Sequence, residues 1–183
     1  LRISEYDLRL KNKDAELALM QAQINPHFLY NMLNAIQWQA LKSGNKEIAD
    51  IAYSMAQVFR ISLSRGRSII SVKQELDLVS YYLSLQKYRL GKKIDYHIDF
   101  DEDVLDRQIP KLILQPLVEN SIVHGMAKDS SLNLVISLSV ALSEDGKSLH
   151  FMIQDNGCGI PPEILRYLPS EVIPAAAEQG QRP

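Results

Sequence analysis

The sequence has 183 residues, of which 46% are hydrophobic and 23% are charged, and its formal net charge is −2 at pH 7. These values are typical of a globular protein of one or two small domains, and they give no support for the basic face that nucleic-acid binding requires. The single cysteine, Cys158, excludes an intrachain disulfide and a cysteine-based metal cluster, which fits a reducing compartment.

No apolar run in this sequence approaches the roughly 18–20 residues that a membrane-spanning helix needs. No basic and apolar signal segment opens it. The first residue is Leu1 and not methionine. We therefore expect the sequence to be a piece of a longer protein.

Residues 1–24 repeat in sevens, as the helices of coiled coils do. One heptad position is filled by apolar residues, and the second position is imperfect. The first position holds Ile3, Leu10, Leu17 and Ile24, and the second holds Tyr6, Lys13, Met20 and His27. We predict a parallel, dimeric coiled-coil stalk that arrives from upstream; the alternative is a single amphipathic helix on its own domain.

Residues 23–31, Gln-Ile-Asn-Pro-His-Phe-Leu-Tyr-Asn, place a histidine on the first turn of a helix. Pro26 lacks a backbone N–H and has a fixed φ, so it favours a helix start, and Asn25 suits the capping position before it. His27 and Asn31 are four residues apart and therefore share one helical face. This arrangement indicates a presented nucleophile; the alternative is a histidine that only closes a kink in the helix.

Two helices joined by a short turn are predicted from this motif onward. The first covers residues 26–41, the sequence Ser-Gly-Asn at 43–45 breaks it, and the second covers residues 46–64 with apolar residues along one stripe. Such a pair forms an antiparallel hairpin. Two copies bury their apolar stripes together in a four-helix bundle, so we predict a homodimer.

A polar link at residues 64–68 leads to a third predicted helix over residues 72–90. Ser71 is its expected N-cap, and Gln74 stands three residues later, which is the spacing of a capping box. Gly91 ends this helix.

After the third helix the pattern changes to alternating apolar and polar residues. The alternation predicts a half-buried strand over residues 94–100, and an acidic turn follows at 101–103. Pro110 is then predicted to begin a helix that runs to about residue 126.

The last ordered elements are predicted to be two strands, over residues 132–142 and 148–154. The turn Glu-Asp-Gly at 144–146 joins them as a hairpin. Residues 155–162 are interpreted as a loop, and residues 169–183 lack periodicity and are interpreted as loop or disorder.

Polar side chains stand beside an apolar face within residues 114–125. They are Glu119, Asn120 and His124, and the last two are again four residues apart. An asparagine that faces a cleft binds Mg²⁺ through its carbonyl oxygen while phosphates supply further oxygens. The alternative is an asparagine that caps a helix or crosses to a neighbouring strand.

The motif Asp155-x-Gly157-x-Gly159 stands at the end of the last predicted strand. Its glycines allow backbone to approach a ligand closely, and its aspartate can accept a hydrogen bond from an exocyclic amine. Many tight turns share this pattern, so alone it is a weak signal. The signal becomes much stronger because the motif follows the Asn120 helix and two predicted strands.

Together the three motifs resemble the cytoplasmic part of sensor histidine kinases of the LytS/YehU type. Residues 23–31 resemble the phosphoacceptor box of that family, 114–125 its N box and 155–160 its first glycine box, in the same order. The resemblance covers roughly residues 16–165. It implies an α+β protein, in which a coiled coil and helical hairpin form a dimeric four-helix bundle and a partial Bergerat-type ATP-binding α/β sandwich follows.

The resemblance implies four parts in this sequence. They are a coiled-coil stalk at 1–24, a phosphoacceptor and dimerisation hairpin at 25–66, a partial ATP-binding domain at 67–168 and a disordered or truncated lid tail at 169–183. The family continues after its first glycine box into a lid and a second glycine-rich box, and no such box stands in this sequence. We therefore expect weak or absent autophosphorylation from this sequence on its own.

On the acceptor side, the resemblance implies that His27 is the phosphorylated histidine and that Asn31 orients or polarises it. A neutral imidazole, with an ordinary pKa of roughly 6.5, is available as a nucleophile at pH 7. Many histidine kinases of other classes carry an acidic residue directly after this histidine, but here the position holds Phe28. The general base therefore stays unassigned.

On the donor side, the implied ligands are ATP and Mg²⁺. Asn120 would bind the Mg²⁺, and Glu119 and His124 would line the phosphate side of the site. Asp155 would hydrogen-bond the adenine amine, and the two glycines that follow it would surround the nucleotide. Val123 stands where related kinases commonly carry Lys or Arg, which removes one phosphate contact.

The implied function is that of a two-component sensor kinase: ATP phosphorylates His27, and the phosphoryl group passes to a response regulator with a receiver domain. The implied location is the cytoplasmic face of the plasma membrane, reached through an upstream segment. One alternative is a catalytically inactive dimerisation and signalling scaffold of the same fold. Another is an unrelated ATPase of this fold, which the His27 motif disfavours. The stimulus, the regulator, and transfer in cis or in trans stay open.

Overall fold

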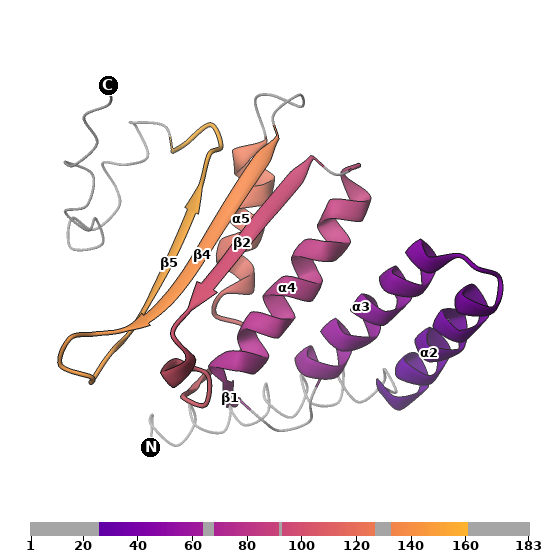
Figure 1. Ribbon diagram of the computed structural model, residues 1–183, viewed down its shortest axis with the longest axis horizontal. Coiled ribbons are helices and arrows are strands. Elements are labelled where there is room, and N and C mark those ends of the chain that lie inside the picture. The colour runs from indigo at the N-terminus through magenta and orange to yellow at the C-terminus, as the bar shows by residue number, and fades with distance from the viewer. Residues whose placement is uncertain (1–25, 64–67, 92, 127–132, 161–183) are drawn as a thin grey trace, which may run out of the picture.

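The protein has an α+β fold, in which a helical hairpin precedes a small sheet with helices packed on one face (Figure 1). The computed structural model describes residues 26–63, 68–91, 93–126 and 133–160. The predicted stalk, most of the polar link and the predicted tail lie outside these residues.

The predicted hairpin is confirmed. It consists of α2 (Pro26–Lys42) and α3 (Lys46–Ser62), and the side chain of Asn45 caps α3 by accepting a 3.1 Å hydrogen bond from the N–H of Ile48. The hydroxyl of Tyr30 donates to the carbonyl of Phe59 at 3.3 Å. This contact ties the start of α2 to the end of α3, as expected for antiparallel helices.

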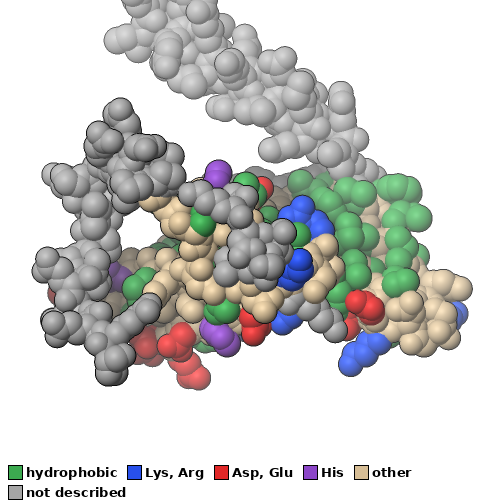
Figure 2. Space-filling view, turned by 90° about the horizontal axis from the view of Figure 1, so that it is seen from above, with side chains coloured by type: hydrophobic (Ala, Val, Ile, Leu, Met, Phe, Trp, Pro, Cys, Tyr) green, Lys and Arg blue, Asp and Glu red, His purple; other side chains and the backbone are tan. Residues whose placement is uncertain are grey.

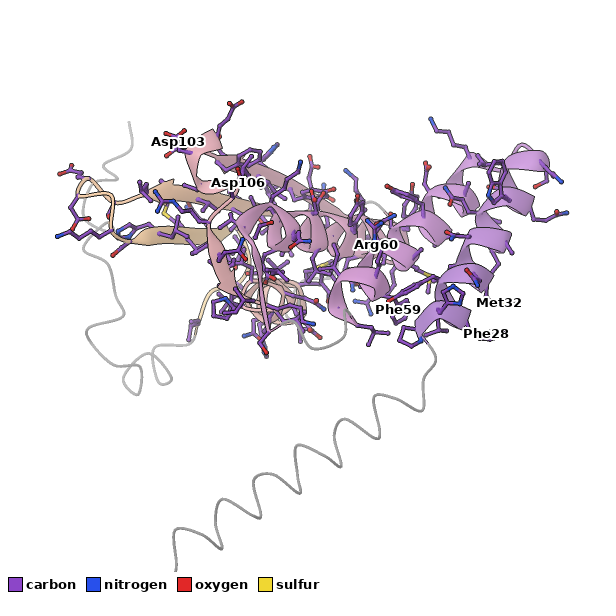
Figure 3. All side chains as sticks on the ribbon, turned by 90° about the horizontal axis from the view of Figure 1, so that it is seen from below. Phe28, Met32, Phe59, Arg60, Asp103 and Asp106 are labelled. Atoms are coloured by element: carbon purple, nitrogen blue, oxygen red, sulfur yellow. The ribbon has the colours of Figure 1, made fainter. Side chains whose placement is uncertain are left out.

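Both helices of the hairpin expose large apolar side chains, and we call five of them the apolar hairpin face. Its members on α2 recur every fourth residue, which places them on one stripe. The face comprises Phe28, Met32 and Ile36 from α2 with Ile48 and Met55 from α3. Figure 2 shows hydrophobic side chains gathered over the end of the molecule that these helices form, and Figure 3 shows Phe28 and Met32 near Phe59.

The third helix, α4 (Val72–Arg89), starts as predicted. The N–H of Gln74 donates to the hydroxyl of Ser71, and the N–H of Ser71 donates to Oε1 of Gln74, each at 3.2 Å. This reciprocal pair is a capping box. Towards the hairpin, α4 places Tyr81 edge-to-face against Tyr53 of α3, with ring centroids 5.8 Å apart. Hydrogen bonding to Tyr53 and burial raise the pKa of Tyr81 to about 12.

The main sheet has the strand order β2-β4-β5, with β2 (Ile94–Phe100), β4 (Leu134–Leu142) and β5 (Leu149–Asp155). β2 runs parallel to β4, whereas β4 and β5 form the predicted antiparallel hairpin. Asp155 pairs with Ile136 near the start of β4. The motif that follows β5 therefore lies at the edge where β4 begins.

The core lies between the sheet and two helices, α4 and α5 (Gln115–Gly125). Every second residue of β2 and β4 faces it, because side chains alternate along a strand. Its buried members are Val72, Leu76, Val79, Leu83, Ile94, Val104, Ile109, Leu114, Val118, Ile122, Leu134, Ile136, Leu138 and Val140. Within the residues that the structure describes, no helix combines the length and the hydrophobicity that crossing a bilayer requires.

The predicted helix over 110–126 is wrong in its first part. Pro110 ends the short strand β3 (Gln108–Pro110), which pairs antiparallel with β1 (Ile69–Ser71), and α5 starts only at Gln115. A proline is tolerated at a sheet edge because its missing N–H is not needed there. Leu112, with φ +64°, then turns the chain away from a helical path. The acidic turn before β3 forms the 3-10 helix η1 (Glu102–Val104).

Candidate nucleotide and phosphoacceptor sites

His27 lies on the first turn of α2, and its side chain is exposed. Its Nδ1 atom lies 3.3 Å from the side-chain nitrogen of Asn31, one turn further along. The predicted sharing of one helical face is therefore confirmed. Asn25, the expected cap of this helix, lies outside the described residues.

The helix α5 carries the polar residues of the second motif on its solvent side. Glu119, Asn120 and His124 are exposed, whereas Val118 and Ile122 are buried against the core. Packing on one face therefore holds the helix, and its opposite face is left available for a ligand.

The charge of Glu119 also acts on Tyr82 of α4. Burial is the first cause that raises the pKa of the Tyr82 hydroxyl, and the negative charge of Glu119 raises it further. A nearby carboxylate disfavours a second negative charge on the phenol. The charge of Glu119 therefore reaches α4, although its side chain is exposed.

The end of α5 and the glycine loop after β5 are in direct contact. The N–H of Cys158 donates to the carbonyl of Gly125 at 3.2 Å, and the thiol of Cys158 donates to the carbonyl of His124 at 3.0 Å. A Cβ atom added to Gly157 would lie 2.4 Å from the Cα of Gly125. Only a glycine fits at this approach, so the structure brings the two predicted motifs together through their backbones.

The glycine loop, residues 155–160, is held at its start. Oδ1 of Asp155 accepts a hydrogen bond from the N–H of Gly157 at 2.9 Å. Asn156 bridges to β4: its Oδ1 accepts from the N–H of Val135 at 2.7 Å, and its Nδ2 donates to the carbonyl of Asn133 at 3.1 Å. The bond from Gly157 orients the Asp155 carboxylate, and the two bonds of Asn156 hold the loop against the start of β4.

These residues fit a nucleotide that carries Mg²⁺. Asn120 and Glu119 offer exposed side-chain oxygens, which are the hard ligands that Mg²⁺ prefers. Asp155 offers an exposed carboxylate that can accept from an amine. Gly159 has φ +69°, and among the described residues no atom lies within 4 Å of a Cβ position there, so these residues leave room for a bound group.

The structure does not bring the acceptor histidine to these residues. α2 lies at one end of the molecule, the loop after β5 lies near the other end, and α4 stands between them (Figure 1). His27 and Asp155 therefore belong to two separate sites in this conformation of one chain.

Three residues that carried no prediction make contacts in the candidate nucleotide site or in the segment before it. Gly125 and Asn156 hold the glycine loop, and Glu75 is a buried charge on α4 that binds the segment before α5. The glycine that ends the N-box motif and the asparagine next to Asp155 were visible in the sequence. Glu75 gave no local signal, because its partners lie 37 and 39 residues further along the chain.

Two family models match the sequence. Residues 15–94 match the family described as histidine kinase, and residues 105–180 match the family described as histidine kinase-, DNA gyrase B-, and HSP90-like ATPase. The first range contains His27, and the second contains α5 and the glycine loop.

Several curated proteins are similar over most of the chain. Sensor histidine kinase YesM of Bacillus subtilis (strain 168) is 33% identical over 153 residues, which cover 84% of this chain and 26% of that protein. Sensor protein LytS of Staphylococcus epidermidis (strain ATCC 12228 / FDA PCI 1200) is 36% identical over 154 residues, 84% of this chain and 25% of that protein. Sensor protein LytS of Bacillus subtilis (strain 168) is 31% identical over 182 residues, 98% of this chain and 30% of that protein.

The chain thus spans 25% to 30% of the length of these three relatives. The similarity includes both the region of the acceptor helix and the region of the nucleotide site, in the order in which histidine kinases carry them. The chain belongs to the LytS/YesM-type sensor histidine kinases of two-component systems.

Proposed function

We propose that the full-length protein transfers the γ-phosphoryl group of ATP to His27 and then to a response regulator with a receiver domain. The observation that carries this proposal is the contact between the end of α5 and the glycine loop. The carbonyls of His124 and Gly125 accept hydrogen bonds from Cys158, so the residues proposed to bind the nucleotide form one surface. An exposed histidine on a separate helix supplies the acceptor.

On the donor side, Asp155 binds the adenine amine and Asn120 holds Mg²⁺ through its side-chain oxygen. Glu119 and His124 line the phosphate side, while Gly157 and Gly159 surround the nucleotide. The Mg²⁺ ion, when bound, neutralises charge on the phosphate oxygens. The contribution of the chain is to orient the nucleotide, which is the main protein contribution to phosphoryl transfer.

On the acceptor side, a ring nitrogen of His27 attacks the γ-phosphorus. A nitrogen–phosphorus bond forms, the bond from that phosphorus to the bridging oxygen breaks, and ADP leaves. Asn31 lies 3.3 Å from Nδ1, and its amide presents its oxygen there after a half turn of the side chain. With a proton on Nδ1 donated to that oxygen, the lone pair of Nε2 is free for the attack.

Transfer requires that the two sites meet. The two sites lie towards opposite ends of the folded molecule (Figure 1). Either a single chain rearranges, or the nucleotide bound to one copy phosphorylates the histidine of another copy. We place the joint at Pro26, where the proposed upstream stalk meets the acceptor helix. A rotation or stretch of that stalk reaches Pro26 and then His27, which gives a physical route for control from the membrane.

The apolar hairpin face supports a homodimer, because two copies that meet there bury it in a four-helix bundle. Met32→Glu is expected to weaken dimerisation by roughly 100-fold, since it places an unpaired charge in that interface. Met152→Glu on β5 is the matched control, because Met152 is 60% exposed against 46% for Met32 but lies outside this face. Sedimentation equilibrium measures both. Equal dissociation constants for the two variants would place the interface elsewhere.

Nucleotide binding tests the donor side of the proposal. MgATP at 100 times its dissociation constant stabilises a protein by about 2.7 kcal/mol, which raises the melting temperature of a chain of this size by roughly 5–10 °C. We expect this shift to disappear in Asn120→Ala and in Asp155→Ala, since each removes a polar group that contacts the nucleotide or its ion.

The controls for that measurement are Asn34→Ala on α2 and Asp103→Ala within η1, and Figure 3 shows Asp103 away from the hairpin. Both side chains are exposed, and both variants are expected to keep the full shift. A shift that survives in Asn120→Ala and Asp155→Ala would show that ATP binds elsewhere.

A further inference from the structure

One buried charge in this molecule has no part in the function proposed above. Glu75 on α4 is fully buried, and it is the one charged residue among the buried side chains of the described part of the chain. Its Oε2 atom accepts from the N–H of Leu112 and its Oε1 atom accepts from the N–H of Leu114, each at 2.9 Å. A buried carboxylate is tolerated only when such bonds satisfy it.

Glu75 stabilises a turn that contains a residue in a strained backbone conformation. Leu112 has φ +64° and is the one non-glycine residue with positive φ among those the structure describes. A leucine in this conformation is strained, so surrounding bonds must enforce it. The two N–H groups that Glu75 binds lie on Leu112 and two residues beyond it. Releasing them would let Leu112 relax and would change the direction in which the chain enters α5.

The carboxylate of Glu75 also lies at the start of α5, which we call the nucleotide helix because it carries residues proposed to bind the nucleotide. Leu114 is the N-cap of α5, and its side chain supplies no capping bond. The bond from its N–H to Glu75 therefore anchors the first turn, and a negative charge at a helix N-terminus is favourable. Asn120 stands six positions further on, in the same rigid helix.

The other end of this turn is tied to the acceptor hairpin. The ammonium group of Lys111 donates to the carbonyl of Ser62 at 2.8 Å, and its backbone N–H donates to the carbonyl of Ser68 at 2.9 Å. Ser62 is the last residue of α3, where helix carbonyls lack partners and a positive charge is favourable. Lys111, which directly precedes Leu112, thus connects this turn to the end of α3.

We infer that residues 111–114 form a coupling turn, in which Glu75 and Lys111 are positioning residues: Glu75 sets the orientation of the nucleotide helix, and Lys111 links that orientation to the acceptor hairpin. The inference rests on the proposed function and adds how its two sites communicate. A shift at the end of α3 reaches Lys111, then Leu112, then the first turn of α5.

The first test replaces Glu75 by Gln in the full-length protein, with Glu144→Gln on the exposed β4–β5 turn as the matched control. An amide presents a donor to one of the two N–H groups, so one bond is lost. We expect the dissociation constant of MgATP to rise at least ~10-fold. Amide hydrogen exchange should quicken at Leu112 and Leu114 but stay slow in β4, which shows that the fold persists. Quickened exchange with an unchanged dissociation constant would overturn the positioning role.

The second test replaces Lys111 by Met, with Lys147→Met on the β4–β5 turn as the control. We expect the dissociation constant of MgATP to stay within about twofold of wild type, because the bonds of Glu75 are intact. The rate of phosphate incorporation at saturating MgATP should fall at least ~5-fold. An unchanged rate, or a rate that falls only through weaker binding, would contradict the coupling. The Lys111→Met variant still tests the coupling turn if Glu75→Gln does not fold.

Measurements on the wild-type protein distinguish a failure of the proposed function from a failure of the coupling turn alone. If it neither binds MgATP nor incorporates phosphate, the proposed function fails and the coupling turn fails with it. If the wild type is active and both variants behave like it, the proposed function stands and only the coupling turn is refuted.

Discussion

Replacing His27 by Gln is expected to abolish the incorporation of phosphate from labelled ATP into the full-length protein. Glutamine keeps a polar side chain on the first turn of α2 but offers no ring nitrogen for attack on phosphorus. Because His27 is exposed, the change should leave the melting temperature and the binding of MgATP close to those of wild type. Label retained on the chain after denaturation measures the effect.

His150→Gln is the matched control for that substitution. His150 is an exposed histidine on β5, outside both proposed sites, so this variant should incorporate label at the wild-type rate. Incorporation that persists in His27→Gln would mean that another group accepts the phosphoryl group. Phosphate release that continues without His27 would instead favour an ATPase of the same fold.

The second large effect is expected from Gly157→Ala. The new Cβ would lie 2.4 Å from the Cα of Gly125 and 2.9 Å from Oδ1 of Asp155, whereas ordinary contacts begin at 3.4 Å. The loop and the end of α5 must therefore separate by about 1 Å, and such a displacement at a binding site costs roughly 100-fold. We expect the dissociation constant of MgATP, measured by calorimetry, to rise by that order.

Gly146→Ala distinguishes this effect from a general loss of stability. Gly146 lies in the β4–β5 turn at φ +69°, so alanine there costs about 1 kcal/mol through backbone strain alone. This variant should melt at a lower temperature yet bind MgATP as wild type does. If Gly157→Ala also binds normally, the approach of the loop to α5 does not matter for the nucleotide.

The elements that the sequence predicts well are those whose signals are local. The second helix of the hairpin follows from its 3.6-residue periodicity, whereas the first follows from its start at Pro26 and from the break at residues 43–45. The capping box needs only Ser71 and Gln74, and both of its hydrogen bonds form. The alternation over Ile94–Phe100 and the turn after β4 likewise specify β2 and the β4–β5 hairpin. None of these requires knowledge of a distant segment.

The wrong prediction of a helix start at Pro110 shows the limit of local sequence patterns. A proline before an apolar segment favours a helix start, yet Pro110 pairs with Ile69, some forty residues earlier in the chain. The strands β1 and β3 have three residues each, which is too short for a periodic signal. Only tertiary contacts decide such a segment, and here they include the bonds of Glu75 to Leu112 and Leu114.

The candidate nucleotide site, too, was predictable only where its signals are local. The motifs around Asn120 and Asp155 were predictable as separate patterns, because each has its own spacing. Their contact through Gly125 and Gly157 was not, since two glycines carry no mark of which backbone they approach. The antiparallel pairing of β4 with β5, by contrast, was predicted, and it puts the start of β4 beside the loop that Asn156 fixes.

The most direct test of the central proposal is to locate the phosphate itself. The full-length protein is incubated with MgATP, digested at alkaline pH, which preserves a nitrogen–phosphorus bond, and analysed by tandem mass spectrometry. We predict phosphate on the imidazole of His27, lost in Asp155→Ala together with nucleotide binding. Phosphate on any other side chain, or none despite bound ATP, would contradict the assignment of His27 as the acceptor.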